Sequence, residues 1–345
     1  MSTLEIRVLV ADDSPTARAL LVAMLSASSG IVVIGEAKDG IEAVEMTARL
    51  KPDVVTMDIQ MPRMNGYEAT QRIMSECPTP IVLVSSLDLR SVEAAMEALR
   101  VGALDVIAKP AGPGSPRHAQ QARHLAALVR AMSDVRLVRH WRDTPPAPGA
   151  LLAESTVRPR VIAIGASTGG PAALRTVFGG LPVDFPVPIL FVQHLAAGFA
   201  DGFATWLDGS VPIRVKLARL GEPIRPGTAY LAPDDLHLGV SGRSTIVLSD
   251  APAVGGFRPA ASSLFESAGR AFGATSLGVV LTGMGNDGLA GLRSLKAAGG
   301  RVYAQDQGTS EVFGMPGVVI QAGIADKVLP LAQISAELLR VVGKS

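Results

Sequence analysis

Apolar and polar positions follow two alternating patterns along the first 110 residues. Short apolar runs rich in β-branched residues predict buried strands, and the stretches between them carry apolar residues at helical spacing. The predicted strands are Ile6–Val10, Ile31–Ile34, Val54–Met57, Ile81–Val84 and Val106–Ala108. Five strand–helix units favour an α/β fold with a doubly wound, flavodoxin-like parallel sheet, whose ligands bind at the carboxyl ends of the strands.

The same alternation returns after residue 157, and here some strands follow one another directly. The predicted strands are Val161–Ile164, Pro188–Val192, Ile213–Lys216, Ala229–Ala232, Ser244–Ser249, Leu277–Thr282 and Gly300–Ala304. Helical patterns separate several of them. The pattern therefore indicates a second α/β domain with a mostly parallel sheet.

Between these regions lie two stretches rich in Pro and Gly, at residues 111–116 and 144–149. Residues 117–142 lack both residue types and predict an amphipathic helix that packs on one domain or bridges the two. Its apolar stripe is Leu125, Leu128, Val129, Met132, Val135 and Val138, and His118, His124 and His140 are expected at the surface. The predicted organisation is thus a domain over 1–110, a linker over 111–156 and a domain over 157–345.

Composition supports a protein with ample apolar core. The chain has 345 residues, 48% hydrophobic and 18% charged, with a net charge of +1, and such a length favours about two domains. No apolar run reaches the roughly 18 residues that span a bilayer, and the first residues do not resemble a secretory leader. The single cysteine, Cys77, excludes an internal disulfide. We expect a cytoplasmic protein without membrane insertion.

Acidic residues gather where the strands of the first domain end. Asp12 and Asp13 follow the first strand and Asp58 follows the third. Three carboxylates in one crevice repel each other unless a hard cation joins them, and oxygen ligands suit Mg²⁺. Asp58 could then attack a phosphoryl group, with the Lys109 ammonium and the Ser85 hydroxyl neutralising its charge.

Four segments of this region, in order, resemble the signature of response-regulator receiver domains. They are Val-Ala-Asp-Asp-Ser (10–14), Met-Asp-Ile-Gln-Met-Pro-Arg-Met-Asn-Gly (57–66), Val-Ser-Ser (84–86) and Ala-Lys-Pro (108–110). The resemblance implies that Asp58 is phosphorylated and that Asp12, Asp13 and Asp58 hold Mg²⁺. It also implies that Lys109 binds phosphate and that Ser85 is the switch hydroxyl, with Ser86 as second choice. Receivers usually carry an aromatic residue where this chain has Val106.

A strand–turn–helix signature stands at the start of the second domain. The run Val161–Ile164 leads into Gly-Ala-Ser-Thr-Gly, which exposes Ser167 beside the N–H groups of a helix start. This turn suits a nucleophile or, equally, a phosphate-binding or purely structural loop. His194 and Asp287 also follow strand ends, so a base and an orienting acid can meet the serine. Asp287 could instead be an Asx-turn residue, and the competing His237 is expected to be a half-buried strand residue.

Five segments of the second region resemble the CheB methylesterase domain. They are Gly-Ala-Ser-Thr-Gly-Gly-Pro (165–171), Val-Gln-His (192–194), Tyr-Leu-Ala-Pro (230–233), Phe-Arg-Pro-Ala (257–260) and Leu-Thr-Gly-Met-Gly-Asn-Asp-Gly (281–288). The resemblance implies a nucleophile Ser167, a base His194 and an orienting acid Asp287. Thr168 and Met284 become active-site neighbours, and the Met284 backbone N–H becomes a candidate oxyanion donor.

Receiver, linker and catalytic domain together resemble the chemotaxis response regulators that act as protein-glutamate methylesterases. The resemblance implies phosphorylation-activated hydrolysis of glutamate γ-methyl esters on methyl-accepting chemotaxis receptors, with release of methanol, and deamidation of receptor glutamine. It implies a CheA-type histidine kinase as phosphodonor, with Mg²⁺ needed only for phosphorylation and no cofactor for ester hydrolysis.

Two other functions fit the sequence less well. A nucleotide-binding regulator would need Gly-x-Gly-x-x-Gly or a closing Lys-Ser/Thr, and residues 165–170 offer neither. A DNA-binding response regulator would need a helix-turn-helix with a basic face, whereas the second domain is rich in strands and nearly neutral. We therefore expect no nucleic-acid partner.

Overall fold

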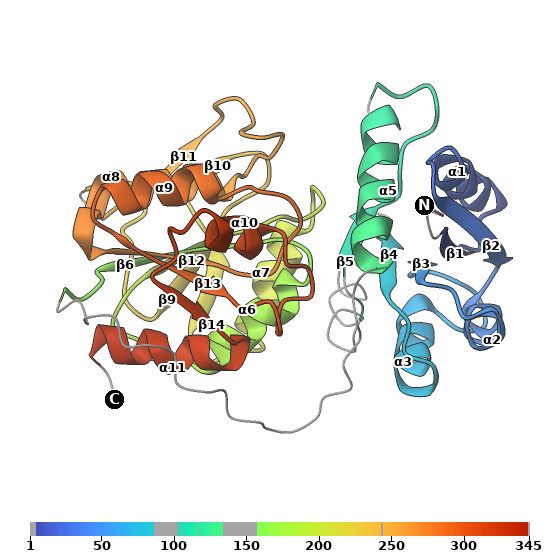
Figure 1. Ribbon diagram of the computed structural model, residues 1–345, viewed down its shortest axis with the longest axis horizontal. Coiled ribbons are helices and arrows are strands. Elements are labelled where there is room, and N and C mark those ends of the chain that lie inside the picture. The colour runs from blue at the N-terminus through green and yellow to red at the C-terminus, as the bar shows by residue number, and fades with distance from the viewer. Residues whose placement is uncertain are drawn as a thin grey trace.

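The computed structural model describes residues 5–85, 103, 105–116, 118–133, 157–242 and 244–343. Its elements form two α/β units, each built on a parallel sheet (Figure 1). Among the helices within those ranges, none is both long enough and apolar enough to cross a bilayer. The predicted fold class, with a five-stranded receiver-like sheet and a mostly parallel second sheet, is confirmed.

The first sheet has the strand order β2-β1-β3-β4-β5, and every pair is parallel. Its elements are β1 (Ile6–Ala11), α1 (Pro15–Ser26), β2 (Ile31–Ala37), α2 (Gly40–Leu50), β3 (Val54–Asp58), α3 (Gly66–Glu76), β4 (Ile81–Ser85), β5 (Asp105–Ala108) and α5 (His118–Ser133). Alternate residues of each strand face opposite sides. Val8 and Val10 therefore pack with α1 and α5, and Leu9 packs with α2 and α3.

The helix that the sequence predicts over residues 117–142 lies on the first sheet. Its described part, α5, buries Leu125, Ala126, Leu128, Val129 and Met132 against α1, β3 and β4. This part of the helix therefore packs on the first domain, which is one of the two placements open from the sequence. His118 is half-buried and His124 is exposed, whereas Val135, Val138 and His140 lie outside the described residues.

The second sheet has seven strands in the order β14-β13-β12-β6-β7-β9-β8, all paired in parallel. The strands are β6 (Val161–Ala166), β7 (Ile189–Gln193), β8 (Arg214–Leu217), β9 (Thr228–Leu231), β12 (Ser276–Val280), β13 (Arg301–Gln305) and β14 (Lys327–Leu329). A separate antiparallel pair joins β10 (His237–Val240) to β11 (Ile246–Ser249). The predicted strand Ser244–Ser249 thus lies in this small sheet.

Helices cover both faces of the second sheet. They are α6 (Gly170–Gly179), α7 (Ala200–Asp208), α8 (Ala261–Phe272), α9 (Leu289–Ala297), α10 (Met315–Gln321) and α11 (Leu331–Val342), with a short 3-10 turn at Gly273–Thr275. In β6, Ile162 and Ile164 pack with α6, α7 and α11, while Val161 and Ala163 pack with α8, α9 and α10. Strand β6 lies between β12 and β7, so the three strands that precede Ser167, His194 and Asp287 are neighbours.

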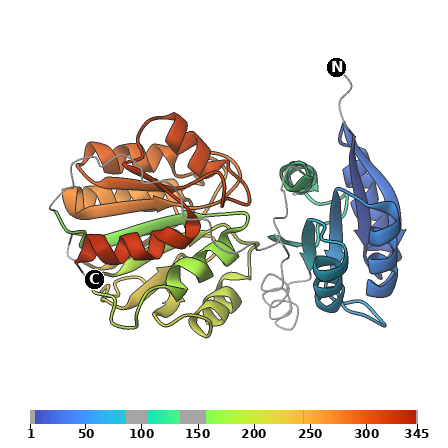
Figure 2. The same cartoon turned by 60° about the horizontal axis from the view of Figure 1, so that its bottom comes forward.

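The two units touch at the end of the receiver sheet that carries β5. Figures 1 and 2 both show β5 and α5 on the side of the first sheet that faces the second unit. Val312 of the second unit packs against the apolar cluster that contains α5 and β4. The contact places the receiver beside the loops that follow the central strands of the second sheet.

Candidate functional site

Ser167 lies in a tight turn between β6 and α6, with its side chain buried. Its backbone N–H donates to the Thr282 carbonyl (3.1 Å), and its own carbonyl accepts from the Gly170 N–H (2.7 Å) and from Gln193 Nε2 (2.8 Å). Gly169 takes a positive φ of 74°, which an L side chain rarely adopts. Three hydrogen bonds to its backbone therefore hold the nucleophile candidate in place, and none of them involves its hydroxyl.

His194 follows β7 directly, and its backbone N–H donates to the carbonyl of Ala166 (3.1 Å), next to Ser167. One ring nitrogen, Nε2, lies 2.9 Å from Oδ2 of Asp287. The other, Nδ1, is buried and has no hydrogen-bond partner. Among the described residues no hydrogen bond joins the Ser167 hydroxyl to the ring. Because Asp287 can only accept, Nε2 carries the proton and Nδ1 has the free lone pair.

Asp287 accepts hydrogen bonds from backbone N–H groups as well as from the imidazole of His194. Oδ2 also accepts from the Ala261 N–H (2.6 Å), and Oδ1 accepts from the N–H groups of Ser262 (3.0 Å) and Gly288 (2.7 Å). Ala261 and Ser262 open α8, which has no side-chain N-cap of its own, so this carboxylate caps the helix from outside. Burial raises the pKa of Asp287, but hydrogen bonds from His194 and Ser262 outweigh it and hold the pKa below its usual range.

Two backbone N–H groups beside the serine are candidates for an oxyanion hole. Neither the Thr168 N–H nor the Met284 N–H donates a hydrogen bond within the described part of the chain. Met284 lies in the turn after β12, between Gly283 and Gly285. Gly283 is needed there because a Cβ would lie 2.8 Å from the Cβ of Ser167. The two N–H groups therefore come from the turns that carry the serine and the acid.

Two further residues contact the site, although the sequence motifs did not predict a role for either of them. Gln193 donates from Nε2 to the carbonyls of both Ser167 and His194 (2.8 and 2.9 Å), which ties the two turns together. The ring of Phe257 stacks on the imidazole of His194, with ring centroids 4.0 Å apart. Both residues lie inside segments that carry the family resemblance, Val-Gln-His and Phe-Arg-Pro-Ala. Their place in these motifs is the sequence feature that could have identified them as site residues.

His237 lies in the strand β10, as the sequence predicts, but it is buried rather than half-buried. Its Nε2 lies 3.1 Å from the Pro252 carbonyl, and its Nδ1 accepts from the Ala260 N–H at 3.3 Å. Both nitrogens are thereby used in holding the segment between Pro252 and Ala260. His237 has no contact with the nucleophile turn among the hydrogen bonds of the described residues.

The hydroxyl of Thr168 does not face solvent but donates to the receiver. Its Oγ1 lies 2.9 Å from Oδ2 of Asp105, at the start of β5. Burial raises the pKa of Asp105, although the Thr168 hydroxyl and the nearby His124 and His194 oppose this effect. A receiver carboxylate is thus held against the residue that follows Ser167.

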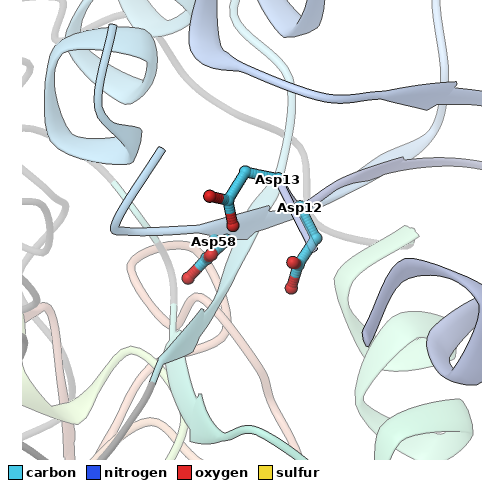
Figure 3. Close-up of side chains that lie close together, drawn as sticks. All are labelled: Asp12, Asp13 and Asp58. Carbon is cyan, nitrogen blue, oxygen red and sulfur yellow. The ribbon is translucent and has the colours of Figure 1, made fainter. Parts of the chain in front are cut away.

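The receiver unit gathers its acidic residues at the carboxyl ends of β1 and β3 (Figure 3). Ligand oxygens of Asp12, Asp13 and Asp58 lie within 4.8 Å of one another. Lys109 Nζ lies 2.8 Å from Asp58 Oδ2 and 3.0 Å from Asp12 Oδ2. One ammonium does not balance three carboxylates, and an all-oxygen donor set suits a hard dication. The cluster therefore fits the Mg²⁺ site that a receiver domain implies.

The electrostatics of Asp58 reflect this imbalance. Burial raises the pKa of Asp58, the hydrogen bond from Lys109 opposes the rise, and the neighbouring Asp12 adds to it. Burial lowers the pKa of Lys109, but its bonds to Asp58 and Asp12 outweigh burial and raise it. The lysine is therefore held as a cation beside the carboxylate that the sequence assigns to phosphorylation.

Of the other predicted receiver residues, Ser85 is linked to Lys109 through the backbone. Ser85 ends β4 and is buried, and its carbonyl accepts from the Lys109 N–H at 2.8 Å. Val106 is buried in β5, where receivers usually carry an aromatic residue. Ser86, the second choice for the switch hydroxyl, lies outside the described residues.

Comparison with known proteins agrees with this architecture. The family model "CheB methylesterase" matches residues 162–338, and "Response regulator receiver domain" matches residues 8–119. The chain is 52% identical over 338 residues to protein-glutamate methylesterase/protein-glutamine glutaminase 4 of Myxococcus xanthus (strain DK1622), covering 96% of each chain. It is 50% identical over 328 residues to number 3 of Anaeromyxobacter dehalogenans (strain 2CP-C), covering 94% of this chain and 95% of the relative.

A solved structure of the Thermotoga maritima CheB methylesterase catalytic domain is also similar. It has 39% sequence identity and a TM-score of 0.52, and the match covers 54% of this chain and 100% of that one. The resemblance predicted from the sequence motifs is confirmed by these matches. The chain therefore belongs to the CheB methylesterase family and joins that domain to a response-regulator receiver domain.

Proposed function

We propose that this protein is a phosphorylation-activated protein-glutamate methylesterase that also deamidates protein glutamine. Its relatives bear the name protein-glutamate methylesterase/protein-glutamine glutaminase. The observation that carries the proposal is the ring of His194, with Nε2 at 2.9 Å from Asp287 and Nδ1 buried without a partner, on a residue whose backbone N–H bonds to the carbonyl that precedes Ser167. That arrangement supplies a general base whose orientation is set by a carboxylate.

The proposed reaction starts with attack of Ser167 Oγ on the γ-carbonyl carbon of a glutamyl methyl ester. His194 Nδ1 takes the hydroxyl proton, and Asp287 stabilises the imidazolium through Nε2. The Thr168 and Met284 N–H groups stabilise the negative oxygen of the tetrahedral intermediate. The C–O bond to methoxide then breaks, and the imidazolium returns its proton to give methanol and an acyl-serine.

Water completes the cycle in the same geometry. His194 Nδ1 removes a proton from water, the resulting hydroxide attacks the acyl carbon, and the bond to Ser167 Oγ breaks as the serine regains its proton. The product is a glutamate γ-carboxylate. With glutamine as substrate the leaving group is ammonia, and the acyl-serine and its hydrolysis are the same.

In the receiver, we propose that Asp58 is the phosphorylated residue, with Asp12 and Asp13 sharing the metal site. Mg²⁺, when bound, neutralises charge on the transferred phosphoryl group. Lys109, held 2.8 Å from Asp58, would supply a further positive charge to the phosphoryl group, and Ser85 supplies a hydroxyl at the end of β4. Asp58 Oδ attacks phosphorus, and the bond to the donor breaks as the acyl phosphate forms.

Regulation is proposed to run through the contact between the two units. Asp105 and Thr168 meet at 2.9 Å, and Val312 packs on the receiver, so the unphosphorylated receiver covers the surroundings of Ser167. The proposed organisation is a receiver over 1–110, a linker over 111–156 and a catalytic domain over 157–345. Phosphorylation at Asp58 would then favour the arrangement in which the receiver leaves this face.

The substrate and phosphodonor are proposed to be methyl-accepting chemotaxis receptors and a CheA-type histidine kinase. The family implies chemoreceptor substrates, and the receiver implies a histidine kinase. The cytoplasmic location expected from the sequence stays a prediction.

The decisive test measures methanol release from a methylated chemoreceptor fragment, with and without acetyl phosphate and Mg²⁺. We expect release to rise with the phosphodonor and to fall by orders of magnitude in Ser167→Ala. Ser210→Ala, at an exposed site of the same domain, is the matched control and should behave as the unchanged protein. Near-normal release by Ser167→Ala would refute the assignment of the nucleophile.

A further inference from the structure

The residues between Pro252 and Ala260 form a compact loop that leads into α8. Its tip is a two-residue turn in which Val254 and Phe257 exchange both backbone hydrogen bonds at 3.0 Å. Gly255 and Gly256 have φ values of 60° and 91°, as a tight turn of this kind requires. The hydrogen-bonded turn therefore fixes the backbone position of Phe257.

Polar groups fix both ends of this loop. His237 contacts the Pro252 carbonyl through Nε2 (3.1 Å) and the Ala260 N–H through Nδ1 (3.3 Å). Arg258 reaches Asp235 at 2.8 Å and the Asp250 carbonyl at 2.9 Å. The buried His237 and the loop residue Arg258 thus hold the loop to the segment that precedes it.

The ring of Phe257 lies flat on the imidazole of His194. The ring centroids are 4.0 Å apart and the planes differ by 4°. Phe257 is partly exposed, while the side chain of His194 is only 10% exposed. One face of the imidazole is therefore covered by an aromatic ring and is closed to water.

The hydrogen bond to Asp287 does not by itself fix the imidazole. It holds one edge through Nε2, and rotation of the ring about χ2 has a broad energy minimum. Stacking of a second ring over the face removes this rotation. With both contacts made, Nδ1 has one direction in which to point.

We propose that Phe257 is a positioning residue for His194: it sets the plane of the imidazole so that Nδ1 faces the Ser167 hydroxyl. This inference rests on the proposed function, because it assigns His194 the role of base. The π face of Phe257 also interacts favourably with the imidazolium that forms when His194 takes the proton. Phe257 thereby acts on catalysis through His194 and without contact to the reacting atoms.

The same segment connects the base to the acid. Four residues after Phe257 the chain enters α8, whose first N–H groups, of Ala261 and Ser262, hold the Asp287 carboxylate at 2.6 and 3.0 Å. One short segment thus positions the face of His194 and the charge of Asp287. A shift of this loop would disturb both at once.

The test compares Phe257→Leu with Phe257→Tyr in the full chain, activated with acetyl phosphate. Leucine keeps apolar bulk but has no ring to stack, whereas tyrosine keeps the stack. We expect Phe257→Leu to lower kcat for methanol release about tenfold or more with little change in KM, because misdirected groups reduce rate rather than binding. Phe257→Tyr should retain kcat within about twofold. Val254→Ala, at the exposed end of the same turn, is the control.

Two readouts are independent of the ester substrate. The rate at which a fluorophosphonate labels Ser167 reports activation by His194 and should fall in parallel with kcat in Phe257→Leu. The proton NMR signal of the His194 ring should be displaced by the ring current of Phe257, and this displacement should vanish in Phe257→Leu and persist in Phe257→Tyr.

Each outcome decides the matter. Unchanged labelling and kcat in Phe257→Leu would overturn the proposal, as would a rise in KM alone, which would make Phe257 a substrate contact. Loss of activity in both variants would mean that the substitutions act by disturbing the loop rather than by removing the ring stack. That outcome would also overturn the proposal. If the unchanged protein is labelled at Ser167 but releases no methanol, the proposed function fails, while the labelling rates still decide the role of Phe257.

Discussion

Thr168 Oγ1 donates a 2.9 Å hydrogen bond to the Asp105 carboxylate, across 63 positions of sequence and between the two units. Thr168 follows the nucleophile candidate, and Asp105 begins the strand that ends beside Lys109. A receiver carboxylate is therefore bound to the residue that follows Ser167.

Replacing Asp105 should weaken inhibition by the receiver. We expect Asp105→Ala to raise methanol release by the unphosphorylated full chain severalfold, because the Thr168 hydroxyl loses its hydrogen-bond acceptor. The rate with saturating acetyl phosphate should not change. Glu76→Ala, on the exposed side of α3 and away from the contact, is the control, and an Asp105→Ala protein with the original basal rate would contradict this role.

The same contact predicts a pH dependence. Burial raises the pKa of Asp105 above its ordinary value while the two units are in contact, so we expect docking to take up a proton in the window between these two values. Docking is then favoured below the ordinary aspartate pKa and weakens as pH rises through the raised pKa. The ratio of basal to activated rate should increase with pH across that window in the unchanged protein and stay flat in Asp105→Ala.

Phosphorylation should depend on Asp58 and on the metal. We expect Asp58→Asn to take up no label from radioactive acetyl phosphate, because an amide oxygen does not attack phosphorus as a carboxylate does. Excess chelator should have the same effect on the unchanged protein, and Asp12→Asn should raise the Mg²⁺ concentration needed. Full labelling of Asp58→Asn would show that another residue receives the phosphoryl group.

Asp287→Asn should separate the catalytic role of this carboxylate from its role at the start of α8. We expect kcat to fall by about 10³ to 10⁴, as when a triad aspartate is replaced in other hydrolases, and the free energy of unfolding to fall by about 1 kcal/mol through the weakened cap. Asp201→Asn, at an exposed position of α7, is the control for kcat. A normal kcat in Asp287→Asn would mean that His194 needs no charged partner.

The lowered pKa of Asp287 predicts how the stability of the protein changes with pH. Its pKa is lowered in the folded protein, so its stabilising effect is complete above the ordinary aspartate pKa of about 3.9 and is lost as pH falls toward the lowered value. Thermal unfolding followed across the acidic range should therefore show a steeper loss of Tm in the unchanged protein than in Asp287→Asn.

Sequence patterns predicted the elements that carry the site but only part of what holds it together. Apolar runs that end in polar residues predicted β6 and β7, because buried parallel strands are continuously apolar. The sequence pattern did not predict the short strands β10 and β14, because four and three residues are too few to show a periodicity. His237 was nonetheless expected in a strand. Contacts between distant segments, such as Phe257 on His194, depend on tertiary packing that no local periodicity reports.

Removal of the receiver gives the last prediction. A fragment beginning near residue 157 contains every strand of the second sheet, and the solved Thermotoga maritima domain that matches it exists as a separate chain. In the full chain, the Asp105–Thr168 bond and the packing of Val312 bring the receiver onto the face that carries Ser167. A covalent linker makes that docking intramolecular and therefore favourable even when the contact itself is weak.

We therefore expect the fragment to release methanol faster than the unphosphorylated full chain, and to be indifferent to acetyl phosphate. Adding a separate fragment of residues 1–133, which comprises the receiver and α5, should inhibit the catalytic fragment only at high concentration, because the effective concentration supplied by the covalent connection is lost. Circular dichroism and fluorophosphonate labelling establish that the fragment is folded and competent. If a folded fragment is no faster than the full chain, the receiver does not inhibit by covering the site, and phosphorylation must instead create a contact that the catalytic domain lacks on its own.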